Sequence, residues 1–165
     1  MKWKNVGKQP CSIGRSLSVL GDRWTLLVLR NAFMGVRRFD DFQAVLGVTR
    51  HVLSDRLKRL VDSNILKKVP YQGRQERFEY RLTEKGHELH PVLMALVTWG
   101  DKWMDEGRGP PIIYQHKSCG HQITPIFVCP ECKEQITSRD VIPMAGPGLI
   151  FEGEDSEDEN STNAG

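Results

Sequence analysis

The 165-residue chain has no apolar run of about 18 residues, the length a helix needs to cross a membrane. Its first ten residues do not follow the pattern of a secretory signal peptide. We therefore expect a soluble, cytoplasmic protein with no membrane partner. Cysteine is also scarce: Cys11 stands alone, and the others form a cluster of Cys119, Cys129 and Cys132. In a reducing compartment such a cluster indicates a metal site rather than disulfides.

Net charge is small as well, at +2, but it is unevenly distributed. Residues 1–108 contain 20 Lys and Arg against 12 Asp and Glu, whereas residues 109–165 contain 3 against 9. A basic first part is typical of a domain that binds nucleic acid. The acidic end, with almost no apolar residues, cannot bury enough surface to order itself.

A helix-turn-helix pattern lies in the basic part. Residues 39–46 have the apolar spacing of a short helix, Gly47 and Val48 form a turn, and Thr49 is placed to cap a second helix. The core stripe of this second helix is Leu53, Leu57 and Leu60, and its opposite face is polar. That face would enter the major groove if this is the recognition helix. Asp55 belongs to it and would be repelled by phosphates, so it should accept from a cytosine amino group or pair with Lys58 or Arg59.

A charged hairpin follows, with strands near residues 65–69 and 77–82 and a loop at Gly73. Its alternation predicts that Phe78, Tyr80 and Leu82 lie on the buried face. Helix, turn, helix and basic hairpin is the order of a winged helix-turn-helix. The residues we expect to contact double-stranded DNA come from the helix pair and from this wing: Arg38, Thr49, Arg50, His51, Ser54, Lys58, Arg74 and Arg77.

Further helices are predicted at residues 12–20, 23–33 and 84–105. Asp22 could cap the second of them, and Trp24 should pack in the core. Pro91 should kink the last helix, because it has no N–H to donate and crowds the preceding turn. The last helix has so much apolar surface that we expect it to be buried against a second copy, giving a homodimer. The fold class is therefore mainly α with a small β hairpin, followed by a small β-rich, zinc-ribbon-like appendage.

The appendage contains two short knuckles, His116-x-x-Cys119 and Cys129-x-x-Cys132, on either side of a strand-like segment at residues 122–128. A two-residue gap lets both members of a pair reach one tetrahedral Zn²⁺. Three Cys and one His would fill its coordination shell, which indicates a structural rather than a catalytic ion. His121 competes with His116 for the fourth position, and His116 is preferred because it completes the knuckle.

Three segments together resemble the HxlR-type winged-helix transcriptional regulators, relatives of the MarR group: GDRWTLLVLRNAFMGVRRFDDFQ, VTRHVLSDRLKRLVDSNILKK and RFEYRLTEKGHELHPVLMALVTWG. The resemblance covers about residues 11–103. It implies a homodimeric, cytoplasmic, DNA-binding regulator and not an enzyme, with the second helix in the major groove and the hairpin as the wing. Some members sense oxidants through a cysteine just before the first helix. Cys11 occupies that place, although the family's Cys-Pro is Pro10-Cys11-Ser12 in this chain.

These patterns divide the chain into an N-terminal arm at 1–10, a winged helix-turn-helix domain with its dimerisation helix at 11–108, a zinc-ribbon-like segment at 109–143 and an acidic disordered tail at 144–165. Two other functions stay open. One is a zinc or thiol-redox enzyme that uses the Cys/His cluster, although no βαβ pattern surrounds Cys129 and Cys132. The other is a winged-helix interaction adaptor without DNA binding, which Asp55 favours. The operator, the direction of regulation and any small-molecule effector are not readable from the sequence.

Overall fold

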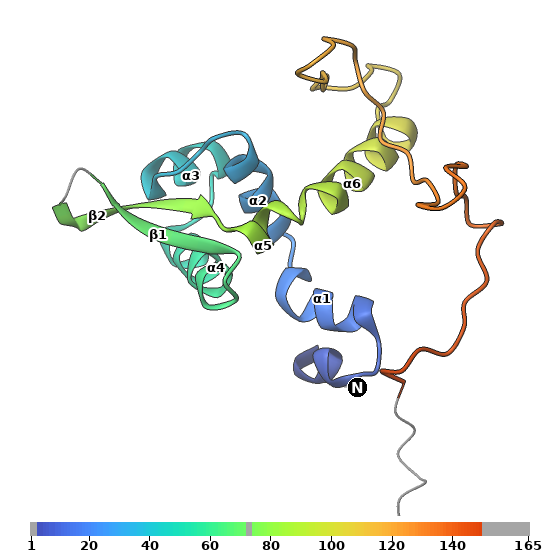
Figure 1. Cartoon of the computed structure of the whole chain (residues 1–165). Helices are drawn as coiled ribbons and strands as arrows, with labels where there is room; N and C mark the ends of the chain where they lie inside the picture. The colour runs from blue at the N-terminus through green and yellow to red at the C-terminus, as the bar shows by residue number, and fades with distance from the viewer. Residues whose placement is uncertain (1–2, 72–73, 150–165) are drawn as a thin grey trace, which may run out of the picture.

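The structure, a computed structural model, describes residues 3–71 and 74–149, without the side chains of residues 3–4 and 74–76. It is mainly helical, with one two-stranded antiparallel sheet (Figure 1). In chain order the elements are the 3₁₀ helix η1 (Trp3–Lys8), α1 (Ser12–Leu20), α2 (Thr25–Phe33), α3 (Phe39–Leu46), α4 (Arg50–Asp62), β1 (Leu66–Tyr71), β2 (Arg74–Leu82), α5 (Glu84–His87) and α6 (His90–Trp103). The helical content and the single hairpin confirm the predicted winged helix-turn-helix class.

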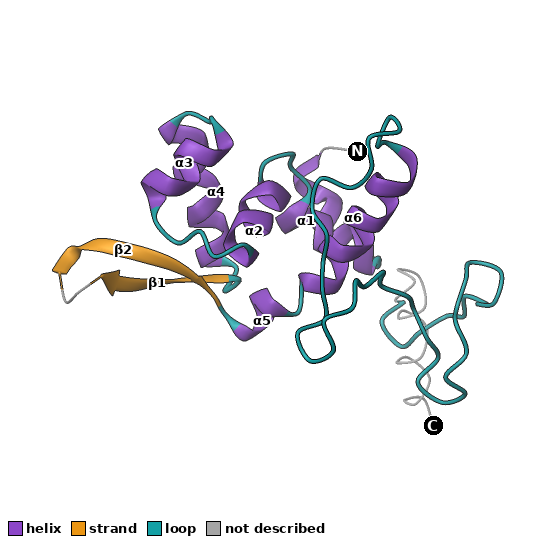
Figure 2. Ribbon diagram, turned by 90° about the horizontal axis from the view of Figure 1, so that it is seen from above, coloured by secondary structure: helices purple, strands orange, loops and turns teal. Residues whose placement is uncertain are grey.

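The core lies where α2, α3 and α4 pack together beside the base of the hairpin (Figure 2). The predicted stripe of α4 is fully buried, with Leu53, Leu57 and Leu60 each at 0% exposure. Phe42 from α3 and Leu29 from α2 are also at 0%. Trp24 is partly buried against this cluster, close to its predicted place. Burying a Leu or Phe side chain contributes about 1.5–3 kcal/mol, so these five residues hold α4 firmly and leave its other face free.

Local hydrogen bonds fix where the helices begin. Gly47 ends α3 in the left-handed region, with φ 63°, and Thr49 caps α4 by accepting the N–H of Val52 at 3.4 Å. Asp22 caps α2 as predicted, because its Oδ1 accepts the N–H groups of Trp24 at 2.9 Å and of Thr25 at 3.1 Å. The helix therefore starts at Thr25 rather than at residue 23.

The carboxylate of Asp22 also pairs with Arg56 of α4, whose Nε lies 2.9 Å from Oδ1. Burial alone raises the pKa of this carboxyl, but hydrogen bonds from Thr25 and Trp24 and the charge of Arg56 outweigh it, so the pKa is lowered. Asp22 thus joins the start of α2 to α4.

The single kinked helix predicted at 84–105 was wrong, because two helices occupy that range. α5 ends at His87, and α6 begins at His90 with Pro91 in its first turn. Pro91 cannot donate to the carbonyl of the preceding turn, so it starts a new helix instead of bending one. Packing also constrains α5 itself, because a Cβ at Gly86 would lie 2.2 Å from the carbonyl oxygen of Ile65. Only glycine lets α5 approach the hairpin this closely.

Two further predictions need correction. Phe78 is 40% exposed, whereas Tyr80 and Leu82 are partly buried as expected. The Phe78 ring lies beyond the edge of the helical core, because only the base of the hairpin packs on that core. The strand predicted at residues 122–128 does not form either. In the described part of the appendage, β structure is limited to the isolated bridges Gln115–Gln122 and Val128–Gln135.

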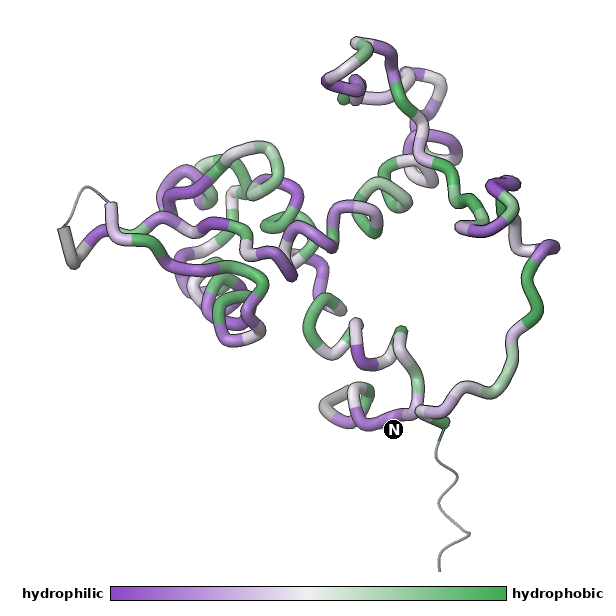
Figure 3. Tube along the Cα trace, viewed as in Figure 1, coloured by the Kyte–Doolittle hydropathy of each residue, from purple (hydrophilic) through white to green (hydrophobic). Residues whose placement is uncertain are grey.

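One apolar face remains open to solvent. It consists of side chains from α1 and α6, and the hydropathy colouring of the backbone trace marks hydrophobic stretches along both helices (Figure 3). Ile13 is 71% exposed, Leu96 47%, Trp99 58% and Trp103 66%. A groove of about 650 Å³ runs between the two helices.

None of the helices in the described part of the chain is both long and apolar enough to span a membrane.

Candidate nucleic-acid interface

The exposed face of α4 carries the side chains that the sequence singled out. Arg50, His51, Ser54 and Lys58 are all exposed, on the side opposite the buried leucines. Thr49 is exposed at the N-terminus of the helix, where its Oγ1 is engaged as the cap. The face therefore combines two cations, an imidazole and hydroxyl groups, which are the groups that read base edges and bind phosphates.

Arg50 is held in place by α3. Its Nη1 donates to Asp40 Oδ1 at 3.1 Å and to Gln43 Oε1 at 3.2 Å, and its guanidinium lies 4.7 Å from the centre of the Phe39 ring. The side chain is still 69% exposed. These contacts orient the guanidinium across the helix-turn-helix junction while leaving donors free for an anion.

Two ion pairs shape the rest of this face. Lys58 donates to Asp62 at 2.5 Å, and this hydrogen bond raises the pKa of its ammonium group. Asp55 pairs with Arg56 at 2.7 Å, rather than with Lys58 or Arg59 as the sequence suggested. Arg56 points inward toward Asp22 and so draws the Asp55 carboxylate toward the protein. The negative charge of Asp55 on this face is therefore partly neutralised by Arg56.

A second part of the surface is a cleft between the helix pair and the wing. It has a volume of about 360 Å³ and contains three arginines, one each from the loop before α3, from α4 and from β2: Arg38, Arg50 and Arg77. Its other lining residues are Asp40 and the aromatic side chains Phe39, Tyr71, Phe78 and Tyr80. Arg38 stacks on Tyr71 with its guanidinium carbon 4.2 Å from the ring centre. Three guanidinium groups around one small cleft make it electropositive and suited to a phosphate.

The wing supplies further cations. Lys67, Lys68 and Arg77 are exposed along the hairpin. Arg74 begins β2, but its side chain and the Gly73 loop lie outside the described residues. Of the predicted DNA-contacting side chains, the structure thus brings Arg38, Arg50 and Arg77 together in the cleft. The others that it describes, Thr49, His51, Ser54 and Lys58, are exposed along α4.

Backbone contacts tie the wing to the helix-turn-helix. The N–H of Tyr80 donates to the carbonyl of Arg37 at 2.8 Å, and Arg38 forms an isolated bridge with Glu79. The segment that leads into α3 therefore pairs with β2 on the side away from β1. This pairing places Arg38 beside the hairpin and sets its distance from α4.

Sequence patterns missed the aromatic residues that support these cations. The sequence marks Phe39 only as part of an apolar stripe, and no sequence pattern marks Tyr71. An aromatic residue near an arginine is too common to signal stacking. Recognising the Arg38–Tyr71 pair requires the register of the hairpin and its docking on α3, which are tertiary information.

The cysteines lie away from this surface. Cys11 is exposed at the N-terminus of α1, where its Sγ accepts the N–H of Gly14 at 3.4 Å. His116 Nδ1 and Cys119 Sγ are 3.3 Å apart, so the first knuckle brings its two predicted ligands together. In the second, N–H groups of Cys132 and Glu131 point at Cys129 Sγ and lower the pKa of that thiol. The described residues contain no group of three metal-ligating side chains, so the two pairs do not meet in this structure.

Comparison with known proteins gives a consistent result. The profile of the family described as HxlR-like helix-turn-helix matches residues 19–108. Rv3095 of Mycobacterium tuberculosis strain H37Rv, named an uncharacterized HTH-type transcriptional regulator, is 47% identical over 138 residues, which cover 84% of this chain and 87% of the relative.

Two solved structures extend the likeness to most of the chain. PA1607, described as a candidate transcription factor, matches with a TM-score of 0.75 and 29% identity, covering 82% of this chain and 95% of its own. PA1374 of Pseudomonas aeruginosa, described in the same way, matches with a TM-score of 0.60 and 31% identity. The match covers 86% of this chain and 97% of PA1374.

Proposed function

The chain belongs to the HxlR-like helix-turn-helix family of transcriptional regulators, and from this premise we propose how it binds DNA. A homodimer places α4 of each protomer in successive major grooves of one duplex. The wing of each protomer lies on the adjacent backbone or minor groove. In this role α4 reads base edges, and the arginine cleft grips a phosphate next to each half-site.

The observation that carries the proposal is the arrangement of the three arginines around one cleft beside the polar face of α4. Arg50 belongs to both, because it begins α4 and lines the cleft. A phosphate bound there would be fixed relative to the base-reading face, which is how backbone contacts set register on a duplex. Neutralising several phosphates would also release counterions, so binding should weaken steeply with salt.

The dimer is supported by the exposed face of α1 and α6. Val92, Leu96, Trp99 and Trp103 are exposed at spacings of four, three and four residues, so they form one stripe along α6. A helix whose apolar stripe points away from its own core needs a partner, and a two-fold axis lets the same stripe serve both copies. The groove between α1 and α6 would receive side chains of the second protomer.

The position of Asp55 bears on the adaptor alternative. A free carboxylate at the centre of the face would repel phosphates, but its pairing with Arg56 reduces that repulsion. This supports DNA binding over a winged helix that serves only as an adaptor. The family supports regulation over catalysis by the Cys/His cluster.

The test is fluorescence anisotropy with labelled DNA from upstream of the protein's own gene, titrated over a range of salt concentrations. Removing one phosphate contact from each protomer should reduce the slope of log K against log salt by about 1.8, at about 0.9 per phosphate. We expect this for Arg77→Ala, whose side chain is exposed in the cleft. Arg108→Ala is the matched control, because Arg108 is 77% exposed and lies beyond the end of α6.

A salt-independent interaction would overturn the proposal. So would equal effects of the two arginine substitutions, since the cleft would then contribute no more than any surface cation. Replacing Lys58 or His51 should change the preferred sequence, which selection from random DNA would show together with the spacing of half-sites.

A further inference from the structure

The appendage contains the same backbone turn twice, 13 residues apart in the sequence. Around the first turn, the N–H of Gly120 donates to the carbonyl of His116 at 2.8 Å, and the N–H of His116 donates to the carbonyl of His121 at 2.9 Å. Around the second, Lys133 donates to Cys129 at 3.0 Å, and Cys129 donates to Glu134 at 2.9 Å. Each bond of the first turn therefore has a counterpart shifted by the same number of residues.

The correspondence extends to the chain on both sides. Ile123 donates to the carbonyl of Tyr114 at 2.9 Å, and Ile136 donates to that of Phe127 at 2.8 Å. The two bridges, Gln115–Gln122 and Val128–Gln135, are related by the same shift. The two turns are thus one structural unit built twice, although their sequences share only one Cys position (Cys119 and Cys132), a Gln and an Ile.

Both units reverse direction through a left-handed residue, which directly follows Cys119 in the first unit and Cys132 in the second. Gly120 has φ 71° and Lys133 has φ 63°. A lysine in this region is strained, since only a few per cent of residues other than glycine adopt positive φ. The sequence of the second unit therefore keeps the turn geometry at an energetic cost, as expected when the turn has to present side chains in a set arrangement.

From this repeat we propose that one Zn²⁺ binds His116, Cys119, Cys129 and Cys132, two ligands from each unit. In a knuckle the first ligand precedes the turn and the second comes three residues later, so that both side chains point to the same side. The repeat places His116 where the second unit has Cys129, and Cys119 where it has Cys132. Three thiolates and one imidazole complete a four-coordinate shell with no open position, which makes the ion structural.

The repeat also decides between the two histidines. His121 corresponds to Glu134, a residue after the turn, and its carbonyl is used in closing the unit. His116 occupies a ligand position, and its Nδ1 is 3.3 Å from Cys119 Sγ. Ser118 Oγ lies 3.0 Å from the same nitrogen and can hold the ring toward the cysteine before a metal arrives. His116 is therefore the fourth ligand, and His121 is not.

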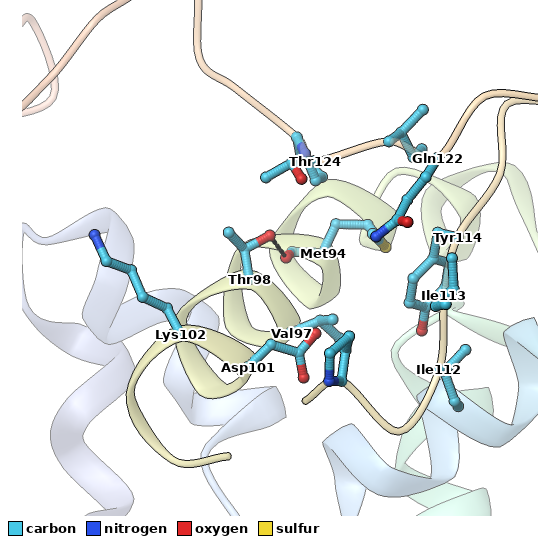
Figure 4. A pocket seen from close by; sticks show the side chains of 13 residues that line it. Met94, Val97, Thr98, Asp101, Lys102, Ile112, Ile113, Tyr114, Gln122 and Thr124 are labelled. Carbon is cyan, nitrogen blue, oxygen red and sulfur yellow. Dashed lines mark hydrogen bonds between the residues drawn. The ribbon is translucent and has the colours of Figure 1, made fainter. Parts of the chain in front are cut away.

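To complete the zinc site, the two units must approach each other, and Phe127 of the second unit must shift within the α1–α6 groove that it lines. The nine residues between Cys119 and Cys129 include no strand or helix, so this link can fold without breaking an element. The first unit is already placed on the body of the protein. Gln122, a member of its bridge, and Tyr114 line a cavity of about 300 Å³ against Met94 and Val97 of α6 (Figure 4). The ion would secure the second unit to this anchored one.

The experiment measures metal on the purified full-length chain without DNA, so its outcome is independent of the proposed function. We expect one Zn²⁺ per chain by mass spectrometry, and a tetrahedral thiolate spectrum when Co²⁺ replaces it. Loaded protein should expose one reactive thiol, that of Cys11, and chelation should release the other three, giving four reactive thiols per chain. His116→Ala should weaken Zn²⁺ binding more than about 100-fold in competition with a chelator, because losing even an outer-shell partner costs about 10–100-fold.

His121→Ala is the matched control and should leave Zn²⁺ affinity unchanged. Circular dichroism of each variant checks that the helices remain, as expected for residues outside the core. The proposal is overturned by a chain that holds no stoichiometric Zn²⁺ or by Cys129→Ser protein that binds it normally. The ligand assignment is overturned if His121→Ala loses the ion and His116→Ala keeps it.

Discussion

The stripe on α6 offers the most quantitative test of the dimer. Trp99 is 58% exposed in the isolated chain. A Trp side chain removes up to about 250 Å² from water when buried, so about 90–145 Å² of this one is available for an interface. At about 25 cal/mol per Å², covering it contributes about 2–3.5 kcal/mol. Two-fold symmetry counts the contribution twice, giving about 4–7 kcal/mol for each dimer.

Trp99→Ala should therefore raise the dimer dissociation constant by about 100- to 1000-fold, since Ala keeps a part of the contact. Sedimentation velocity over a concentration series measures this constant directly. The folded protomer should lose little stability, because most of the side chain faces water in the absence of a partner.

Val45→Ala is a suitable control: Val45 is also 58% exposed, but it lies on α3. It should leave the dissociation constant unchanged. The reasoning fails if the wild-type chain is monomeric at micromolar concentration, or if the two substitutions have the same effect. A loss of thermal stability in Trp99→Ala at a concentration where both proteins are monomeric would show that the ring packs within its own chain.

Three other expectations can be tested on the same protein. Gly86→Ala should destabilise the fold by about 1–3 kcal/mol, because the new Cβ would meet the Ile65 carbonyl. Gly100→Ala, where a Cβ would meet nothing within 4 Å, should stabilise the fold by up to about 1 kcal/mol. Denaturant unfolding measures both changes in free energy, and changes of the same sign would contradict the packing. Asp22→Asn keeps the cap but loses the negative charge, so the variant should be less stable than the wild type. This loss of unfolding free energy should be full above pH 3.8, the ordinary pKa of the carboxyl, and should vanish as pH falls through the lowered pKa of the folded state. A loss that persists in acid would exclude an electrostatic cause. Asp55→Asn should strengthen binding to unrelated DNA several-fold, because it removes a negative charge from the face of α4. Unchanged affinity in anisotropy titrations would mean that this carboxylate lies away from the phosphates.

Much of the helix-turn-helix was predictable because each of its features is local or periodic. The spacing of Leu53, Leu57 and Leu60 marked the buried side of α4, and the hydroxyl of Thr49 before that run marked its start. Both assignments hold in the structure. The polar face follows once the buried one is known, so the exposure of most candidate contacts could be inferred without coordinates.

What the sequence could not predict depends on contacts between distant parts of the chain. Periodicity shows that α6 has an apolar stripe, but not whether that stripe is covered by its own chain or by another. Nor does it show what covers Ile13 on α1. Alternation in β2 placed Phe78 on the inner face, yet the core ends before reaching it. The close approach of Gly86 to Ile65 depends on how α5 packs against the hairpin, and the repeated turn depends on hydrogen bonds that link dissimilar sequences.

The backbone pairing between Arg37 and Tyr80 has a mechanical consequence. Because the segment entering α3 is hydrogen-bonded to β2, movement of the wing relative to the helix pair is restrained, and so is the separation between Arg77 on the wing and α4 within each protomer. Any mismatch between that separation and the groove dimensions of a given sequence must then be absorbed by bending or narrowing of the duplex. Sequences that deform easily would be favoured at base pairs that no side chain touches.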